Sequence, residues 1–217
     1  MSWPAWDIVA SERDIVETPA SASVKASLLI RSMAAFGLIG FASGILVWLV
    51  ISFVWESFIG LDAHAEFAGW DLSFGHLTLV PGLLFGNAVA LALIRFGLTS
   101  AVRALAYIAA STVANFIATN FAANMVDAID STAFLGMAAG FIGAVCLTGL
   151  SLPLLPFARQ LAPCLAMVAA GTALGTLLHV AIEDSSSWGR GFLLLYAFWQ
   201  AGYGAALGTA LPRGSMA

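Results

Sequence analysis

The side chains best suited to bind a metal ion are the three histidines and the acids beside them. His179 and Glu183 lie four residues apart, so on a helix they share one face. His76 begins another apolar run at a similar predicted depth. Imidazole and carboxylate groups are common ligands of divalent ions. We therefore treat His76, His179 and Glu183 as a candidate divalent-metal site, and ordinary hydrogen bonding at the membrane interface as the alternative.

A second set of polar side chains is neutral and lies within apolar sequence. Residues 103–127 form a membrane-length segment with alanine at every fourth position from 106 to 122. At about 100° per residue, Asn115 and Thr119 fall on one arc, and Asn120 and Asn124 fall on another. Side-chain amides in hydrocarbon need partners. We expect this helix to lie in the middle of a bundle, where its asparagines bond to neighbouring helices or to a ligand.

Amide, hydroxyl and indole groups from several apolar runs could converge in one half of such a bundle. Apolar walls with a few placed polar groups are typical of small-molecule sites. The residues that we predict to bind a small solute are Asn87, Asn115, Thr119, Asn120, Asn124, Gln200 and Trp70.

Standard catalytic and nucleotide-binding motifs are missing from the sequence. It contains no GxxxxGK[ST], GxGxxG, GxSxG or HExxH. No acidic or basic residue falls in the middle of an apolar run, which disfavours proton-driven transport through a mid-membrane carboxylate.

The composition places the chain in a lipid bilayer. It is 61% hydrophobic and 9% charged, against about 25% charged residues in a soluble domain. The formal net charge of −4 disfavours nucleic acid as a partner. Cys146 and Cys164 both lie in apolar runs, so a disulfide framework is not expected.

Charged residues divide the chain into uncharged runs of about the length that a bilayer helix needs. These runs predict an all-α fold, a polytopic integral membrane bundle of six transmembrane helices. We expect the fourth helix to stop near Leu152, before Pro153, and Pro81 to lie in the first turn of the second helix, where proline costs little. The uncharged runs are 32–55, 77–94, 104–126, 131–158, 160–182 and 191–212.

The signs of the charges predict the orientation. Apart from Arg190, the basic residues fall in the N-terminal tail, the second and fourth loops and the C-terminus, whereas the acids after the tail fall in the other three loops. By the positive-inside rule, both termini are cytoplasmic. We expect a multi-pass protein of the cell membrane, as in a bacterial inner membrane, with a cytoplasmic tail over residues 1–28 and a single transmembrane domain over 29–217.

Two further features bear on packing. The long outer loop between the first two helices, residues 56–75, is rich in aromatic residues, and we expect it to fold back as an interfacial helix or a lid. Glycines recur at four-residue spacing, a pattern that favours close helix packing. These pairs are Gly40 and Gly44, Gly82 and Gly86, Gly136 and Gly140, Gly171 and Gly175, and Gly204 and Gly208.

Three functions fit these observations. The first is binding or transport of a small solute from the outer face, with a partner protein in the membrane supplying energy. Six spans, inside termini and an outer lid are similar in outline to the substrate-binding membrane components of energy-coupling vitamin importers, a likeness of architecture that no sequence motif carries. The second is a non-catalytic accessory or structural subunit of a larger membrane complex. The third is an intramembrane metal-dependent enzyme that uses the histidine and acid cluster.

Overall fold

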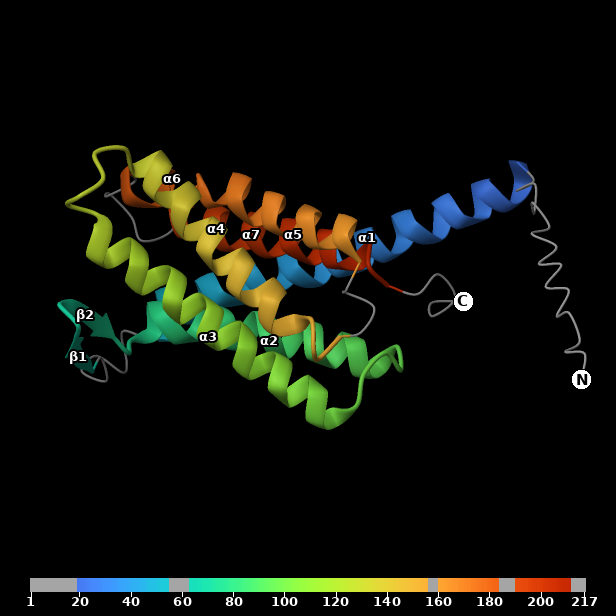
Figure 1. Ribbon diagram of the computed structural model, residues 1–217, viewed down its shortest axis with the longest axis horizontal. Helices are drawn as coiled ribbons and strands as arrows, with labels where there is room; N and C mark the ends of the chain where they lie inside the picture. The colour runs from blue at the N-terminus through green and yellow to red at the C-terminus, as the bar shows by residue number, and fades with distance from the viewer. Residues whose placement is uncertain (1–18, 55–62, 156–159, 184–189, 212–217) are drawn as a thin grey trace, which may run out of the picture.

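The protein folds as a bundle of long helices with one short β-hairpin at its end (Figure 1). The computed structural model describes residues 19–54, 63–155, 160–183 and 190–211. The elements are α1 (Pro19–Leu49), the π-helix η1 (Val50–Val54), β1 (His64–Phe67), β2 (Trp70–Ser73), α2 (His76–Arg95), α3 (Ala101–Met125), α4 (Thr132–Ser151), α5 (Leu161–Gly175), α6 (Leu178–Glu183) and α7 (Arg190–Gly208). The predicted tail over 1–28 is described only from Pro19, where α1 already begins.

Five helical segments are long and apolar enough to cross a membrane, so this is a multi-pass integral membrane protein. These segments are Ser23–Phe53, His76–Arg95, Ala101–Met125, Thr132–Ser151 and Leu161–Glu183. The sixth predicted run corresponds to α7, which has 19 residues and packs along α1 (Figure 1). Its inner face carries the buried polar side chains Tyr196, Gln200 and Tyr203, and these make α7 less apolar than the other five segments.

The helices pack as close pairs, α1 with α7, α2 with α3 and α4 with α5. Glycines make this possible, since a Cβ atom added at Gly40 would lie 2.1 Å from the carbonyl oxygen of Gln200 on α7. One added at Gly140 would lie 2.4 Å from the carbonyl oxygen of Gly171 on α5. The predicted backbone-to-backbone packing is therefore confirmed.

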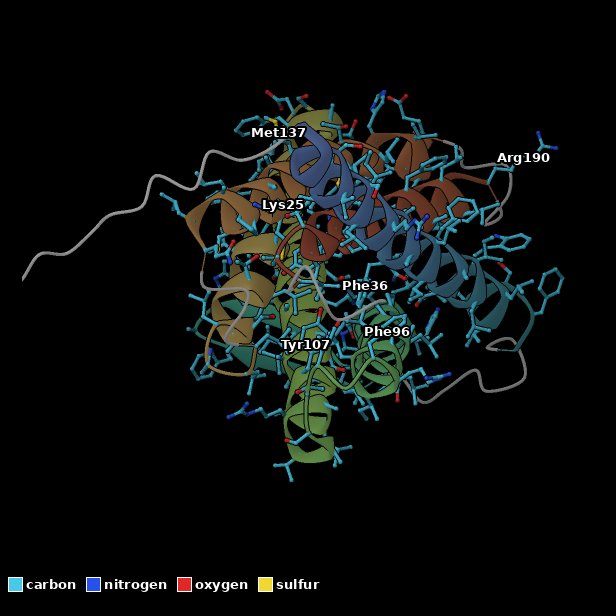
Figure 2. All side chains as sticks on the ribbon, turned by 90° about the vertical axis from the view of Figure 1, so that its right-hand side faces the viewer. Lys25, Phe36, Phe96, Tyr107, Met137 and Arg190 are labelled. Atoms are coloured by element: carbon cyan, nitrogen blue, oxygen red, sulfur yellow. The ribbon has the colours of Figure 1, made fainter. Side chains whose placement is uncertain are left out.

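With the exception of Arg190, which starts α7 beside α6, charges of opposite sign lie at opposite ends of the described bundle. We call the end where α2 stops and α3 starts the basic end, because it holds Arg95 and Arg103. The end where α3 stops and α4 starts is the acidic end, with Asp127 and Asp130. In the view of Figure 2, Arg190 at the start of α7 lies at the periphery with its side chain directed outward.

Two predictions about prolines have different outcomes. The helix α4 ends at Ser151 with Leu152 as its C-cap, as expected from Pro153. The placement of Pro81 in a first turn is wrong, because α2 begins at His76 and Pro81 lies inside the helix. A proline there cannot donate a backbone N–H, so the carbonyl oxygen of Leu77 loses its usual partner.

The described part of the first loop is a β-hairpin and not the interfacial helix that we expected. Strands β1 and β2 pair antiparallel, with Phe67 opposite Trp70. The two residues between them, Ala68 and Gly69, have φ angles of 52° and 80°. Positive φ at both positions is typical of the tight two-residue turns that match the twist of a hairpin. Residues 56–62 of the loop lie outside the described chain.

Two asparagines of α3 bind the outer edge of this hairpin. The backbone N–H of Asp71 donates to Asn124 Oδ1 at 2.9 Å, and Asn124 Nδ2 donates to the carbonyl oxygen of Asp71 at 2.8 Å. Asn120 makes the same pair of bonds with Ser73, at 2.7 and 3.2 Å. The two amides thus satisfy alternate residues of β2, as a third strand would.

The basic half of the bundle is a packed core. Phe36, Phe85, Tyr107 and Tyr203 are among its largest fully buried side chains. The ring centroids of Phe36 and Phe96 lie 6.1 Å apart with the rings tilted by 40°, and Figure 2 labels the two residues close together. The acidic half of the bundle therefore packs against a well-filled core.

Candidate solute-binding cavity

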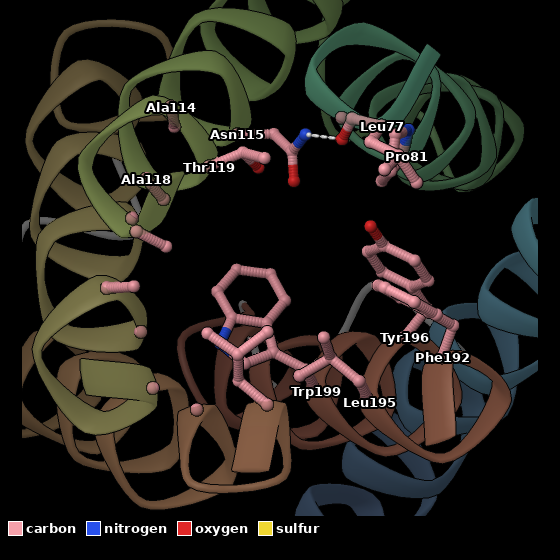
Figure 3. Close-up of a pocket in the computed structure, with 18 of the residues that line it drawn as sticks. Leu77, Pro81, Ala114, Asn115, Ala118, Thr119, Phe192, Leu195, Tyr196 and Trp199 are labelled. Carbon is pink, nitrogen blue, oxygen red and sulfur yellow. Dashed lines mark hydrogen bonds between the residues drawn. The ribbon is translucent and has the colours of Figure 1, made fainter. Parts of the chain in front are cut away.

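A cavity of about 290 Å³ lies inside the acidic half of the bundle. Its walls come from α2, α3, α4, α7 and the segment that holds α5 and α6. Along α3 the lining runs from Ser111, in the middle of the helix, to Val126 just past its end. The cavity therefore extends from the middle of the bundle to the acidic end. Figure 3 shows part of its lining, with Asn115 and Thr119 on one wall and Tyr196 across from them.

Small residues on α3 and α4 leave this space open. Ala114, Ala118 and Ala122 of the alanine row line it on α3. On α4 the lining includes Gly143, where an added Cβ would lie 3.1 Å from Ala118 Cβ and 3.9 Å from the Trp199 ring. Alanine and glycine let the backbones approach where they touch, and they leave room where the helices diverge.

Aromatic side chains form the floor of the cavity. The ring centroids of Phe85 and Trp199 are 6.4 Å apart, and both residues line the cavity. Beneath them Tyr203 stacks on Trp199 at 5.5 Å and is fully buried. The Trp199 indole is fixed because Nε1 donates to the carbonyl oxygen of Gly171 at 3.0 Å. This packing closes the cavity toward the basic end.

Asn115 supplies the hydrogen bond that Pro81 cannot make, and this bond fixes the orientation of its own amide. Its Nδ2 donates to the carbonyl oxygens of Leu77 at 3.2 Å and Thr78 at 2.8 Å. The first of these oxygens is the one that Pro81 leaves without a donor. Both N–H groups of the amide are thereby used, and Figure 3 shows the Asn115 oxygen directed into the cavity.

Gln200 on α7 is oriented by the same proline. Its Nε2 donates to the carbonyl oxygen of Pro81 at 3.3 Å. Its Oε1 is buried and has no hydrogen-bond partner among the described residues, although the side chain is only 2% exposed and lines the cavity.

Two hydroxyl groups join these amide oxygens. Tyr196, one helical turn before Gln200, is 9% exposed, and Figure 3 shows its hydroxyl pointing into the cavity. Thr119 lies one turn after Asn115 on the facing wall. Neither hydroxyl bonds to another residue within the described chain. We call Asn115, Thr119, Tyr196 and Gln200 the polar set.

Apart from Ser111, the remaining lining is apolar, and none of the described lining residues is charged. A charged solute would therefore lose its hydration in the cavity and meet no opposite charge there, which costs much free energy. The chemistry available is hydrogen bonding and apolar contact with a neutral molecule.

The structure separates the predicted solute-binding residues into two groups. Asn115, Thr119 and Gln200 line the cavity. The others lie outside it: Asn120 and Asn124 bind the hairpin, Asn87 donates to the carbonyl oxygen of Leu83 in its own helix, and Trp70 packs against Phe121. The solute-binding role stays a prediction for all of them.

Tyr196 was not among the residues predicted from the sequence to bind a solute. Its spacing of four from Gln200 was the available signal, because residues four apart share a helix face.

The structure brings two of the three candidate metal ligands together. His179 Nε2 lies 3.0 Å from Glu183 Oε2, and His179 Nδ1 lies 2.5 Å from the Thr132 hydroxyl. Within the described ranges, no group of three or more histidine, cysteine or acidic side chains is placed to hold a metal ion, so His76 does not join this pair. The His179 contacts are those of the hydrogen-bonding alternative, linking α4 to α6.

No protein-family model, curated protein or solved structure matches the chain. Its function is therefore argued from its own geometry.

Proposed function

We propose that this protein binds a small neutral solute in the cavity of its acidic half. One observation carries the proposal: an apolar cavity of about 290 Å³ is lined by the polar set, in which Gln200 Oε1 is buried without a hydrogen-bond partner among the described residues. Buried polar atoms are almost always hydrogen-bonded. A bound molecule would supply the missing bonds here.

The orientation follows from the charges. We propose that α7 is the sixth crossing and that the basic end faces the cytoplasm, by the positive-inside rule. Both termini are then cytoplasmic, and the cavity faces the outside. The hairpin, held on α3 by Asn120 and Asn124, lies on that outer side.

The geometry favours a binding component over a self-sufficient transporter. The floor of Phe85, Trp199 and Tyr203 closes the cavity, and the sequence carries no nucleotide-binding motif. Among the described residues, no charged side chain lines the cavity to couple uptake to protons. Transport would therefore require a partner protein in the membrane that supplies energy and opens the closed end.

An accessory subunit of a membrane complex is the second candidate. The N-terminal part of α1 extends beyond the rest of the bundle (Figure 1). On it Val24 and Ile30 are 58% and 64% exposed. A partner helix could pack on this stretch, although lipid would cover it equally well.

Native mass spectrometry of gently extracted protein tests the proposal. Ala118 lines the cavity, so Ala118→Leu would fill part of it without removing a polar group. Ala109 lies on the exposed side of the same helix, and Ala109→Leu is the matched control. We expect a small molecule to accompany the wild type and the Ala109 variant, and the Ala118 variant to carry at least about tenfold less.

Two results would contradict this expectation. A small molecule retained equally by both variants would place its site elsewhere. A wild-type protein free of small molecules but bound to another polypeptide would favour the accessory subunit.

A further inference from the structure

We infer that the cavity selects neutral solutes that carry hydrogen-bond donors on a flat ring body. This inference rests on the proposed function and adds the class of ligand. It follows from the fixed orientation of the two amide groups of the polar set.

Asn115 presents an acceptor because its donors are already engaged. Its two N–H groups face the carbonyl oxygens of Leu77 and Thr78. Turning the amide over would set its oxygen against those two oxygens, which is repulsive. Only Oδ1 is left for a ligand, and it can only accept.

Gln200 presents a second acceptor, and a single hydrogen bond sets the orientation of its amide. Its Nε2 is engaged by the carbonyl oxygen of Pro81, and its buried Oε1 has no partner among the described residues. An unpaired acceptor in apolar surroundings raises the free energy of the empty site. A ligand N–H or O–H would remove this cost, whereas an acceptor-only ligand would not.

The two hydroxyls do not change this selection. Tyr196 and Thr119 can both donate and accept, so they adapt to whichever group the ligand presents. A carboxylate ligand would meet two fixed acceptors and no cation in the described lining. An anion is therefore excluded.

The walls favour a flat ring. Phe85 and Trp199 form the floor, and Phe192 stacks on Tyr196 at 6.0 Å at one side. Aromatic side chains favour offset-stacked and edge-to-face contacts with other rings. A cavity of about 290 Å³ is at the small end of the range for ligand sites.

Three bicyclic probes of nearly the same shape test the selection. Indole carries one N–H donor, benzofuran has an oxygen acceptor in its place, and indene has neither. Binding is measured by equilibrium dialysis against the full chain in lipid nanodiscs, with empty nanodiscs subtracted as the blank. We expect indole to bind about tenfold more tightly than benzofuran or indene, although the other two enter lipid more readily.

Two variants locate the acceptor. Gln200→Met keeps the length of the side chain but removes the oxygen, and we expect the preference for indole to fall to about threefold or less. Asn87→Leu is the control, since Asn87 lies outside the cavity and bonds only to its own helix. We expect this control to keep the full preference. Should Gln200→Met not fold, the wild-type probe series decides alone.

The outcomes separate the two proposals. If none of the three probes binds, the proposed function fails, and the inference fails with it. If the probes bind but benzofuran or indene matches indole, the cavity is a binding site and only the donor selection is wrong. An undiminished indole preference in folded Gln200→Met would overturn the acceptor role of Gln200.

Discussion

Replacing Asn115 with leucine should cost more stability when residue 81 is proline than when it is alanine. In the native chain, Pro81 leaves the carbonyl oxygen of Leu77 without a donor in its own helix. Asn115 Nδ2 supplies that donor at 3.2 Å and also donates to Thr78 at 2.8 Å. Asn115→Leu removes both bonds and leaves the carbonyl oxygen of Leu77 without a donor.

The magnitude follows from the number of bonds. Hydrogen bonds between membrane helices average about 0.6 kcal/mol and reach about 1.7 kcal/mol. Asn115→Leu should therefore lower the free energy of unfolding by about 1–3 kcal/mol. With alanine at position 81, the restored backbone N–H can donate to Leu77. The cost of Asn115→Leu should then shrink by about 1 kcal/mol, which is the coupling energy of the pair.

A double-mutant cycle measures this coupling. The wild type, Asn115→Leu, Pro81→Ala and the double variant are unfolded reversibly in mixed micelles with increasing denaturing detergent, and helix content is followed by circular dichroism. Asn87→Leu replaces Asn115→Leu in a control cycle, because Asn87 bonds within α2 to Leu83. If the losses in the free energy of unfolding for Asn115→Leu and Pro81→Ala add within about 0.3 kcal/mol, the hydrogen bond from Asn115 to Leu77 does not compensate for Pro81. The fixed direction of the amide oxygen would then be refuted as well.

The other predictions concern the hairpin and the α1–α7 contact. Asn124→Leu removes both bonds to the backbone of Asp71, so hydrogen exchange at the Asp71 amide should accelerate about tenfold; exchange unchanged from the wild type would contradict the docking. Gly44→Ala should lower the free energy of unfolding by about 1–3 kcal/mol, because the new Cβ would lie 2.4 Å from Ala197 Cα. Gly149→Ala is its control and should be neutral or slightly stabilising, since nothing lies within 4 Å of a Cβ there; equal losses in both variants would disprove the close contact.

The sequence predicted the features that depend on composition and spacing. A bilayer imposes a helix length and removes charge from the interior, so the charge-free runs locate most helix ends within a few residues. The start of α1 was missed, because this helix begins at Pro19, before the charged residues Lys25 and Arg31. Glycine pairs such as Gly40 and Gly44 predicted close packing, because a residue without a side chain lets the backbone of any neighbouring helix come closer. The end of α4 was predicted from Pro153, because a proline cannot continue a regular helix.

The features that were missed depend on which partner a polar group finds. Asn115 and Asn120 are both asparagines on α3, yet one bonds to α2 and lines the cavity, whereas the other bonds to the hairpin. Their helix positions separate them onto two arcs, but spacing does not say what lies opposite each arc. The hairpin itself was missed because an aromatic loop suits an interfacial helix as well as two short strands.

The central claim is that a small neutral molecule reaches the polar set from the acidic end. A single cysteine at Thr119 tests it directly, in a chain with Cys146 and Cys164 replaced by alanine. We predict that Thr119→Cys reacts with a small membrane-impermeant thiol reagent added outside intact cells, and that indole slows this reaction. Labelling that occurs only after the protein is unfolded, or a rate that indole leaves unchanged, would contradict the account.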